Sequence, residues 1–378
     1  MANDTPDPNA SQHSPRRAGA ADLDTWSRRE AGASGGFTNP DTSDWIPFTP
    51  TPDFVDQPAV IDASHFVDAP SGSHGFARPD AEGRFVFEDG TVARLIGGQT
   101  NAFPEKAYAD WHVKWMRRFG LNLVRGHGFG LPDPEKWDRL DYFISRCKDA
   151  GVYVILTPVY WTEFEVEDPD GKKVTTSSHV ILFFDDNLET AVRHLWRAFY
   201  RHENPYTGLR YGDDPTIIGF ELKNEDSAFF ALNWVKNDAP QYWRAMQRQF
   251  SAYLKNKYGS TGALREAWTD GGTRPSTLAD GESLESGNVD ILDMSAWNNH
   301  RDDPVAEGRR RRADQTSFLH EKQTGFYRRS YKYLREDLGC GQAICGSNWR
   351  GFGYTMRHVL ECDSHLDYTD QHDYWDHP

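Results

Sequence analysis

The sequence predicts an α/β protein built around a parallel β-sheet, and its repeating rhythm is the main reason. From residue 91 to residue 202, strand-like apolar runs alternate with helix-like segments in units of about 30 residues. A further strand pattern, T-I-I-G-F-E-L-K-N-E-D at 216–226, continues the series. Such a series is typical of parallel sheets. A (β/α)8 barrel is favoured over a doubly wound sheet, because G-G-Q-T-N after the first strand is not a glycine-rich phosphate turn.

The strand pattern at 216–226 is the centre of this prediction. Alternation along a strand divides it into an apolar and a charged face. The apolar face carries Ile218, Phe220 and Leu222. The charged face carries Glu221, Lys223 and Glu225. Charges on a buried strand need an enclosed polar setting, which the interior and mouth of a barrel supply while helices cover the apolar face. Asn224 and Glu225 are then expected at the carboxyl end of the strand, where such barrels keep their chemistry.

Composition narrows the classes of function before any motif is considered. The 378 residues suffice for one barrel-sized domain or two ordinary ones. A net charge of −15 argues against a polyanion-binding surface, so no nucleic-acid partner is expected. The four cysteines lack a metal-type spacing such as C-x-x-C. No apolar run reaches the roughly 18 residues of a membrane span, so no membrane partner is expected either.

Three regions are predicted along the chain. Residues 1–57 are rich in Pro, Gly, Ser, Asp and Ala without a sustained period, which indicates a flexible tail or linker. Short apolar runs between turn signals at 58–89 predict a strand-rich lead-in packed on the barrel. The barrel is assigned to 90–378, with a polar rim insertion at about 259–315. The N-terminus shows no apolar signal-peptide core, so a secreted or periplasmic location is expected only if a signal was removed.

Hydrophobic spacing predicts the first strand–helix unit. The strand covers 92–101, V-A-R-L-I-G-G-Q-T-N. The helix after it covers about 107–119 and ends at Gly120. Aromatic residues recur in this helix every four positions, and we interpret them as its core-facing stripe: Trp111, Trp115 and Phe119.

The second and third units follow the same plan. The second strand, 121–127, carries Arg125 and His127 on one face. Asp133 is the predicted N-cap of the next helix, which Gly151 ends. The third unit consists of a strand at 152–158 running into Trp161, a charged hairpin-like loop, and a helix at about 186–202.

The C-terminal part supplies two more strands. Helices are predicted at about 240–258 and 315–338, a fifth strand at 342–349 and a sixth at 366–374. An eight-stranded barrel needs two further strands. Either two strands escape the pattern, or a second polypeptide completes the sheet, or the chain is truncated after strand six. Truncation is the favoured explanation.

Four short motifs occur in an informative order. D-G-T-x-x-R-L-I-G-G leads into the first strand, and V-R at Arg125 lies in the second. F-E-L-K-N-E ends on Asn224 and Glu225 in the fourth, and H-D-Y-W carries His372 and Tyr374 in the sixth. From about residue 85 to the end of the sequence, this set resembles the retaining glycoside hydrolases of the cellulase superfamily, the clan A barrels that include glycoside hydrolase family 5.

The resemblance implies an activity and a set of roles. It implies hydrolysis of a β-linked glycan (glucan, mannan or related) with retention, with Glu225 as general acid/base and without a cofactor. The expected partner is an oligo- or polysaccharide, and the oligomeric state is left open. Two departures stand out. Asp226 occupies the place of a common Pro, and the nucleophilic Glu of strand seven is expected beyond Pro378.

General principles of glycoside hydrolysis assign roles to the same residues. Retaining hydrolysis needs two carboxyl groups about 5–5.5 Å apart, one attacking the anomeric carbon and one protonating the leaving oxygen. Glu225 suits the acid role if its surroundings raise its pKa. Asn224 would hold the sugar 2-hydroxyl. The other expected substrate-site residues are Arg125 and Tyr374, which would orient the nucleophile, His127 and His372, which would line the cleft, and Trp161, which would offer a stacking face.

Structural explanations compete with these roles. Glu221 and Lys223 are interpreted as a buried ion pair without a catalytic part. Arg125 would also fit a structural pair with Glu221 or Glu225. Both His127 and His372 would equally fit satisfied core positions, and Asn348 at the end of strand five is a weak further candidate.

Two other functions stay open. A metal-dependent hydrolase would use His372, Asp376 and His377, since His and Asp at close spacing bind divalent ions. A barrel that binds carbohydrate without cleaving it, or an inactive fragment, is the second, because the expected nucleophile lies outside the sequence.

Overall fold

The structure is a computed structural model. It describes residues 43, 55–57, 62–100, 103–127, 130–270, 272, 275–292, 308–349, 351 and 354–373, except for the side chains of His127 and Tyr354. The chain divides into two units, Met1–Thr51 and Pro52–Pro378, and every element named here belongs to the second. Within the described residues, no helix has the length and apolarity needed to cross a membrane.

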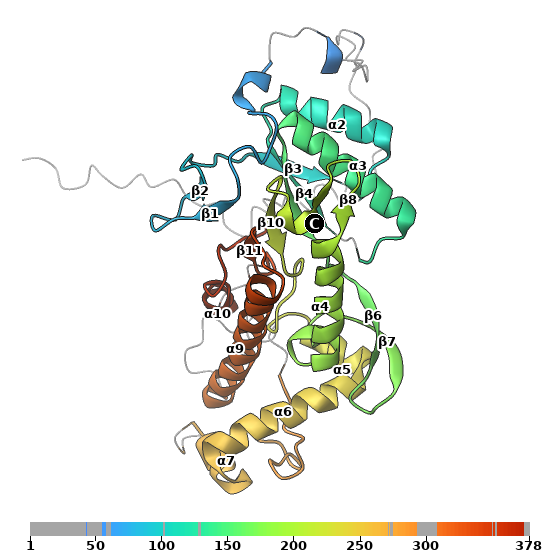
Figure 1. The fold of residues 1–378 in the computed structure, drawn as a ribbon. Helices are drawn as coiled ribbons and strands as arrows, with labels where there is room; N and C mark the ends of the chain where they lie inside the picture. Colours follow the sequence, from blue (N-terminus) through green and yellow to red (C-terminus); the bar gives the residue numbers. More distant parts are fainter. Residues whose placement is uncertain are drawn as a thin grey trace, which may run out of the picture. The chain divides into compact units, whose positions relative to one another are not determined.

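A parallel five-stranded sheet forms the centre of this unit (Figure 1). Its strands, in spatial order, are β11 (Ala343–Cys345), β10 (Ile217–Glu221), β5 (Tyr153–Thr157), β4 (Leu123–His127) and β3 (Gly97–Thr100). Every neighbouring pair is parallel. The predicted α/β class with a parallel sheet is therefore confirmed. The described strands form an open sheet with β3 and β11 at its edges, so the closed barrel stays a prediction.

Helices connect the strands, as the βα rhythm predicted. They are α2 (Lys106–Arg118), α3 (Pro134–Ala150), α4 (Asp186–Arg201) and α9 (Arg309–Lys332), the last continued by a π-helical turn at Tyr333–Asp337. The predicted ends of α3 are correct. The carboxylate of Asp133 accepts the Lys136 N–H at 2.9 Å, and Gly151 follows with a φ of 82°.

The remaining elements lie around this framework. The other helices are α5 (Leu232–Asp238), α6 (Pro240–Tyr258), α7 (Thr261–Ala267) and α10 (Tyr354–Asp363), with 3-10 turns at Ser64–Phe66, Ile181–Phe183 and Tyr211–Asp213. Three antiparallel hairpins pair β1 (Ala77–Pro79) with β2 (Phe85–Phe87), β6 (Glu163–Glu167) with β7 (Lys173–Ser177), and β8 (Glu203–Asn204) with β9 (Leu209–Arg210).

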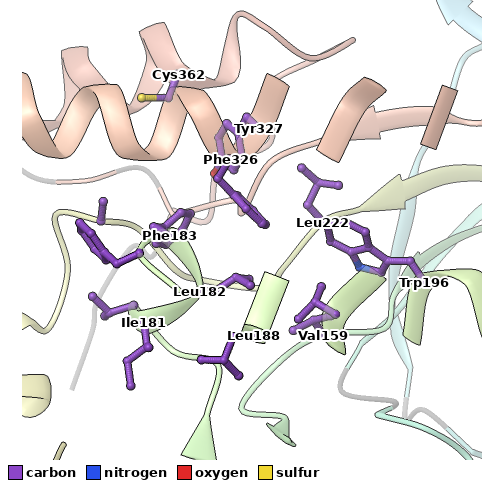
Figure 2. Close-up of a cluster of buried hydrophobic side chains, with 14 of the residues drawn as sticks. Val159, Ile181, Leu182, Phe183, Leu188, Trp196, Leu222, Phe326, Tyr327 and Cys362 are labelled. Atoms are coloured by element: carbon purple, nitrogen blue, oxygen red, sulfur yellow. The ribbon is translucent and has the colours of Figure 1, made fainter. Parts of the chain in front are cut away.

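The main core lies between the sheet and helices α4 and α9. Trp196 of α4 is fully buried, with its ring centroid 6.4 Å from that of Phe220 on β10 and 6.3 Å from that of Phe326 on α9. Figure 2 shows Leu222 beside Trp196 in this cluster. Removing a side chain of this size from a packed core costs about 3–5 kcal/mol. Apolar packing against α4 and α9 therefore fixes the outer face of β10.

The opposite face of the sheet borders a cavity of about 560 Å³. Apolar side chains such as Ile155 and Ile218 form much of its wall, and the hairpin β1–β2 packs on the same face through Phe87. Arg125 and Asp370 also line the cavity and are its charged residues. The cavity on the inner face of the sheet is thus mostly apolar, and its charges are those of Arg125 on β4 and of Asp370.

The predicted face of β10 is wrong for Ile218. Phe220 packs in the main core, but Ile218 packs on the inner face with Tyr153. The cause is a register shift between Ile217 and Gly219, an irregularity of the bulge type that interrupts the alternation of side chains. Simple alternation along the sequence does not reveal such a shift.

The core stripe predicted for α2 is also displaced. Its buried apolar residues are Ala109, Val113 and Met116. Trp115 is only partly buried, and Phe119 is 44 % exposed. The apolar face of α2 is formed by smaller residues, so the aromatic spacing identified the helix but not the side that faces the core.

The predicted sixth strand is not formed over 366–373. The segment runs beside β11, with hydrogen bonds from the Asp367 N–H to the Ile344 carbonyl (3.0 Å) and from the His372 N–H to the Asn348 carbonyl (2.8 Å). The Asp367 side chain also accepts the Ile344 N–H at 2.6 Å, a bond that a ladder would give to a main-chain carbonyl. The side chain thereby replaces a ladder bond, and no strand is assigned to the segment.

Candidate active site

The chain leaves β10 at Glu221, so Asn224 and Glu225 lie in the loop after the strand and not on it. Asn224 is 3 % exposed, and its N–H donates to the Val159 carbonyl at 2.9 Å. Glu225 has a φ of 40°, in the left-handed region that a non-glycine residue seldom adopts. Its N–H donates to Asn348 Oδ1 at 2.9 Å. The left-handed turn replaces strand alternation in deciding where the Glu225 side chain points.

The Glu225 carboxyl group begins a chain of polar contacts across the sheet. Its Oε1 lies 2.5 Å from His372 Nδ1. The other ring nitrogen of His372, Nε2, contacts the guanidinium of Arg125 from β4. Arg125 Nη1 pairs with Asp370 Oδ2 at 2.5 Å. The side chains of all four residues are between 17 % and 30 % exposed, so the group is accessible while still partly shielded from water.

These contacts assign the proton on His372. A guanidinium has only N–H donors, so Nε2 accepts from Arg125 and Nδ1 carries the proton of a neutral imidazole. Nδ1–H then donates to the Glu225 carboxyl group. Burial opposes the charge of Arg125, but the carboxyl groups of Glu221 and Asp370 outweigh it and hold the pKa of Arg125 above its usual value. Arg125 is therefore a permanent cation that sets the His372 tautomer.

Two buried polar side chains, Glu221 and Asn348, hold the loop that carries Asn224 and Glu225. Glu221 is completely buried, and burial, as the largest cause, raises the pKa of its carboxyl group to about 8. Its oxygens contact Thr157 Oγ1 and Asn348 Nδ2. Asn348 Nδ2 also donates to Asn224 Oδ1 at 3.1 Å. Asn348, only a weak candidate from the sequence, is thus in contact with both residues of the Asn-Glu pair.

The predicted Glu221–Lys223 ion pair is wrong. Lys223 Nζ pairs with Asp226 Oδ2 at 3.2 Å and donates to the Tyr160 carbonyl (2.9 Å) and Ser178 Oγ (3.0 Å). Because β10 ends at Glu221, strand alternation does not extend to Lys223, and the two side chains have different surroundings. The role of Asp226 follows from these contacts, since it balances a fully buried ammonium group.

Aromatic side chains lie beside this buried pair. His179 is 2 % exposed, with Nδ1 3.3 Å from Asp226 Oδ1. Its ring centroid is 4.2 Å from that of Trp161, which is 54 % exposed, and 5.4 Å from that of Phe230. Trp349, next to Asn348, lies 5.1 Å from Phe230 by the same measure. An open aromatic surface thereby adjoins the loop that carries Glu225.

Several predicted residues fall outside what the structure describes: the side chain of His127 and the whole of Tyr374, Asp376 and His377. The predicted metal cluster therefore has no described geometry beyond His372. Among the described residues, Glu221, Cys345 and Asp370 bring possible ligand atoms within 4.8 Å of one another. Asp370 is already paired there with Arg125, so a fixed cation supplies the positive charge at this cluster.

Sequence reasoning missed Asp370 and His179. Asp370 had a usable signal, because it stands two positions before His372 and an extended segment places such residues on one side. His179 had none, since its contact with Asp226 joins two loops that are 47 positions apart. The structure brings Arg125, Asn224, Glu225 and His372 together, with Trp161 at the neighbouring aromatic surface.

Comparisons with known proteins cover part of the chain. Residues 104–271 match the model of glycoside hydrolase family 42, described as beta-galactosidase. Mannan endo-1,4-beta-mannosidase 2 of Arabidopsis thaliana is 25 % identical over 139 residues, which are 34 % of this chain and 31 % of that protein. The protein of the same name from Oryza sativa subsp. japonica is 27 % identical over 146 residues, 36 % and 30 % of the two chains. The chain thus spans about a third of the length of these relatives.

Solved structures give a weaker likeness. An endo-1,4-beta-mannanase from Rhizomucor miehei is 16 % identical, covers 78 % of this chain and 99 % of its own, and superposes with a TM-score of 0.33. An endo-beta-1,4-mannanase from Thermotoga petrophila is 14 % identical, with 75 % and 68 % covered and a TM-score of 0.32. The matched family model and the curated relatives are all glycosidases, which agrees with the resemblance that the ordered motifs carry.

Proposed function

We propose that the protein hydrolyses a β-linked polysaccharide, with a mannan as the first substrate to test, and that Glu225 is its general acid/base. One observation carries the proposal. Glu225 lies at the carboxyl end of a parallel sheet. Its backbone N–H donates to Asn348 Oδ1, and the Oε1 of its side chain contacts His372 Nδ1. This is the edge where parallel α/β sheets bring catalytic side chains together.

The proposed reaction follows the retaining scheme. The nucleophilic Glu that the family resemblance implies attacks the anomeric carbon while the Glu225 acid gives its proton to the glycosidic oxygen, so that the C–O bond breaks and a glycosyl ester forms. Glu225, now a carboxylate, takes a proton from water, and the resulting hydroxide attacks the ester to release the sugar. Asn224 would bind the 2-hydroxyl, Arg125 would orient the attacking carboxylate, and Trp161 would stack on a sugar ring. His127 and Tyr374 keep the roles predicted from the sequence.

The test is the Glu225→Gln variant, assayed on mannan and on a mannoside with a dinitrophenyl leaving group. Mannan hydrolysis should fall by about 10²–10⁴-fold, the usual contribution of a general acid. Release of dinitrophenol in the first turnover should be nearly unaffected, because that leaving group departs without a proton. The exposed Glu203→Gln is the matched control and should behave as the wild type. Unchanged mannan hydrolysis by Glu225→Gln would refute the assignment.

A carbohydrate-binding protein without hydrolytic activity is the second candidate, favoured by the 54 % exposure of Trp161. It predicts that the wild type binds mannan but releases no reducing ends. Trp161→Ala should then weaken mannan binding, because the aromatic face that would stack on a sugar ring is lost. Hydrolysis by the wild type excludes this candidate directly.

A further inference from the structure

Asn348 joins the proposed acid/base to a carboxyl group that has no part in the reaction. Its side-chain Oδ1 accepts the Glu225 N–H at 2.9 Å. Its Nδ2 donates to Asn224 Oδ1 at 3.1 Å and to Glu221 Oε1. Its main-chain carbonyl accepts the N–H of His372 at 2.8 Å, and His372 in turn binds the Glu225 carboxyl group. One residue therefore contacts the Asn-Glu pair and the histidine at the same time.

Glu225 needs such support because of its backbone. A left-handed φ at a non-glycine residue costs about 1–3 kcal/mol and persists only where the surroundings hold it. Asn348 itself has a φ of 45° and directly follows Ser347, whose hydroxyl donates to the Asp226 carbonyl. The two strained residues are thus tied together on both sides, and their conformations depend on each other.

Glu221 fixes which way the Asn348 amide points. With Nδ2 held by Glu221 and Asn224, only Oδ1 is available to the Glu225 N–H. Glu221 is 0 % exposed and Asn348 is 1 % exposed, so water does not compete for these bonds. If the donor and acceptor of the Asn348 amide were exchanged, two N–H groups would face each other at Glu225.

We propose that Glu221 and Asn348 act as a positioning pair, which holds the Glu225 loop and His372 in the geometry that proton transfer requires. This inference rests on the proposed function and adds to it two residues that touch neither substrate nor reacting atoms. Its prediction is specific, because the pair has a defined direction: the donor is on residue 348 and the acceptor is on residue 221.

The direction can be reversed by mutation. The assays are run above pH 8, because the pKa of the Glu221 carboxyl group is about 8 and Glu221 is then ionised. Under that condition Asn348→Asp keeps an acceptor for the Glu225 N–H but sets a carboxylate oxygen against the carboxylate of Glu221. Glu221→Gln adds to Asn348→Asp an amide N–H that donates back to the new carboxylate, restoring the bond with its direction reversed. We expect Asn348→Asp to lower kcat on mannan by about 10²-fold, the cost of a misplacement of about 1 Å, with KM within about threefold. The double variant should recover at least about tenfold of that loss.

Two further variants separate positioning from folding. Asn348→Gly removes the amide at a residue with positive φ, where glycine is unstrained, and should lower kcat while the protein stays folded. Asn122→Asp is the matched control. Asn122 Oδ1 accepts the Ile96 N–H and its Nδ2 donates to the Arg94 carbonyl, each at 2.9 Å. Like Asn348, its side-chain amide therefore both accepts and donates, but it is not in contact with Glu225. Its replacement should change the unfolding temperature but not kcat.

The outcomes separate this inference from the proposed function. If Glu225→Gln hydrolyses mannan like the wild type, the proposed function fails first. If Glu225→Gln is inactive but folded Asn348→Gly keeps its kcat, the positioning pair is refuted and the proposed function stands. A double variant no better than Asn348→Asp, with both unfolding like the wild type, also refutes the pair.

Discussion

Asp363 is a second carboxyl group that folding places in an unfavourable setting. It is 2 % exposed, and within the described part of the chain its Oδ1 has no hydrogen-bond partner. Burial first, and the charge of Asp370 second, raises its pKa to about 8. A Cβ on Gly346 would lie only 2.5 Å from this Oδ1, so the glycine leaves the room that Asp363 fills. The carboxyl group is held neutral in the fold near neutral pH.

Asp363→Asn should therefore stabilise the protein as pH rises. The wild-type carboxyl group ionises near pH 4 when unfolded but near pH 8 when folded, so the folded state binds the extra proton and stability falls across that window. The amide cannot ionise, so we expect a gain of roughly 1–3 kcal/mol at pH 8 and little gain at pH 4. Urea unfolding at both pH values measures it. The exposed Asp238→Asn, as control, should show no such trend, and a gain for Asp363→Asn that is equal at both pH values would contradict the explanation.

At the scale of single residues, the sequence located the Asn224–Glu225 pair with its neighbours Arg125 and His372. Their types and strand order carried that information. Asn348 was only weakly indicated and His179 not at all, because their contacts join loops that come together only when the sheet is built. The ion pair of Lys223 was also missed, because Lys223 lies beyond the end of β10 and pairs with Asp226. Long-range contacts decide these partners, and strand alternation does not.

At the scale of elements, β3 approaches β4 so closely at Gly97 that no side chain fits at that position. A Cβ on Gly97 would lie 2.0 Å from the Leu123 carbonyl oxygen, a backbone atom. A Cβ on Gly98, the next residue of the same strand, would meet nothing within 4 Å. The two glycines thus form a matched pair in one edge strand, one required by a close approach and one not.

Gly97→Ala should consequently separate β3 from β4 and destabilise the protein by about 1–3 kcal/mol, because the added Cβ would overlap a backbone carbonyl oxygen that cannot move aside alone. Gly98→Ala should change stability by less than about 1 kcal/mol. Urea unfolding of both variants against the wild type decides the matter. Equal effects of the two substitutions would show that β3 does not lie on β4 in the register of Gly97 with Leu123.

The bounds of elements with end signals were predictable, whereas the extent of a strand depends on its pairing and was not. The N-cap of Asp133 and the terminal Gly151 located α3 at both ends. The fifth strand was predicted but is shorter, at Ala343–Cys345. The sixth strand failed because the Asp367 carboxylate takes the Ile344 N–H, a substitution of side chain for main chain that apolar runs do not reveal.

At the scale of the molecule, the parallel α/β class followed from the βα rhythm, whereas closure of a barrel depends on pairing between edge strands. The reactivity of the four cysteines can report whether the described sheet and helices unfold in one cooperative transition. Cys147 lies in α3, Cys340 precedes β11, Cys345 lies within it, and Cys362 lies in α10. All four are free, and none is more than 3 % exposed.

These thiols should become reactive together. Burial raises the pKa of each one, so the reactive thiolate is suppressed in the folded protein. If helices α3 and α10 and strand β11 belong to one cooperative unit, each thiol reacts only through global unfolding, at least about 10³-fold more slowly than in the denatured chain. With a chromogenic thiol reagent at increasing urea, we expect four thiols to appear in one transition that coincides with the loss of circular dichroism. Early reaction of Cys147 alone would show that α3 opens independently of β11.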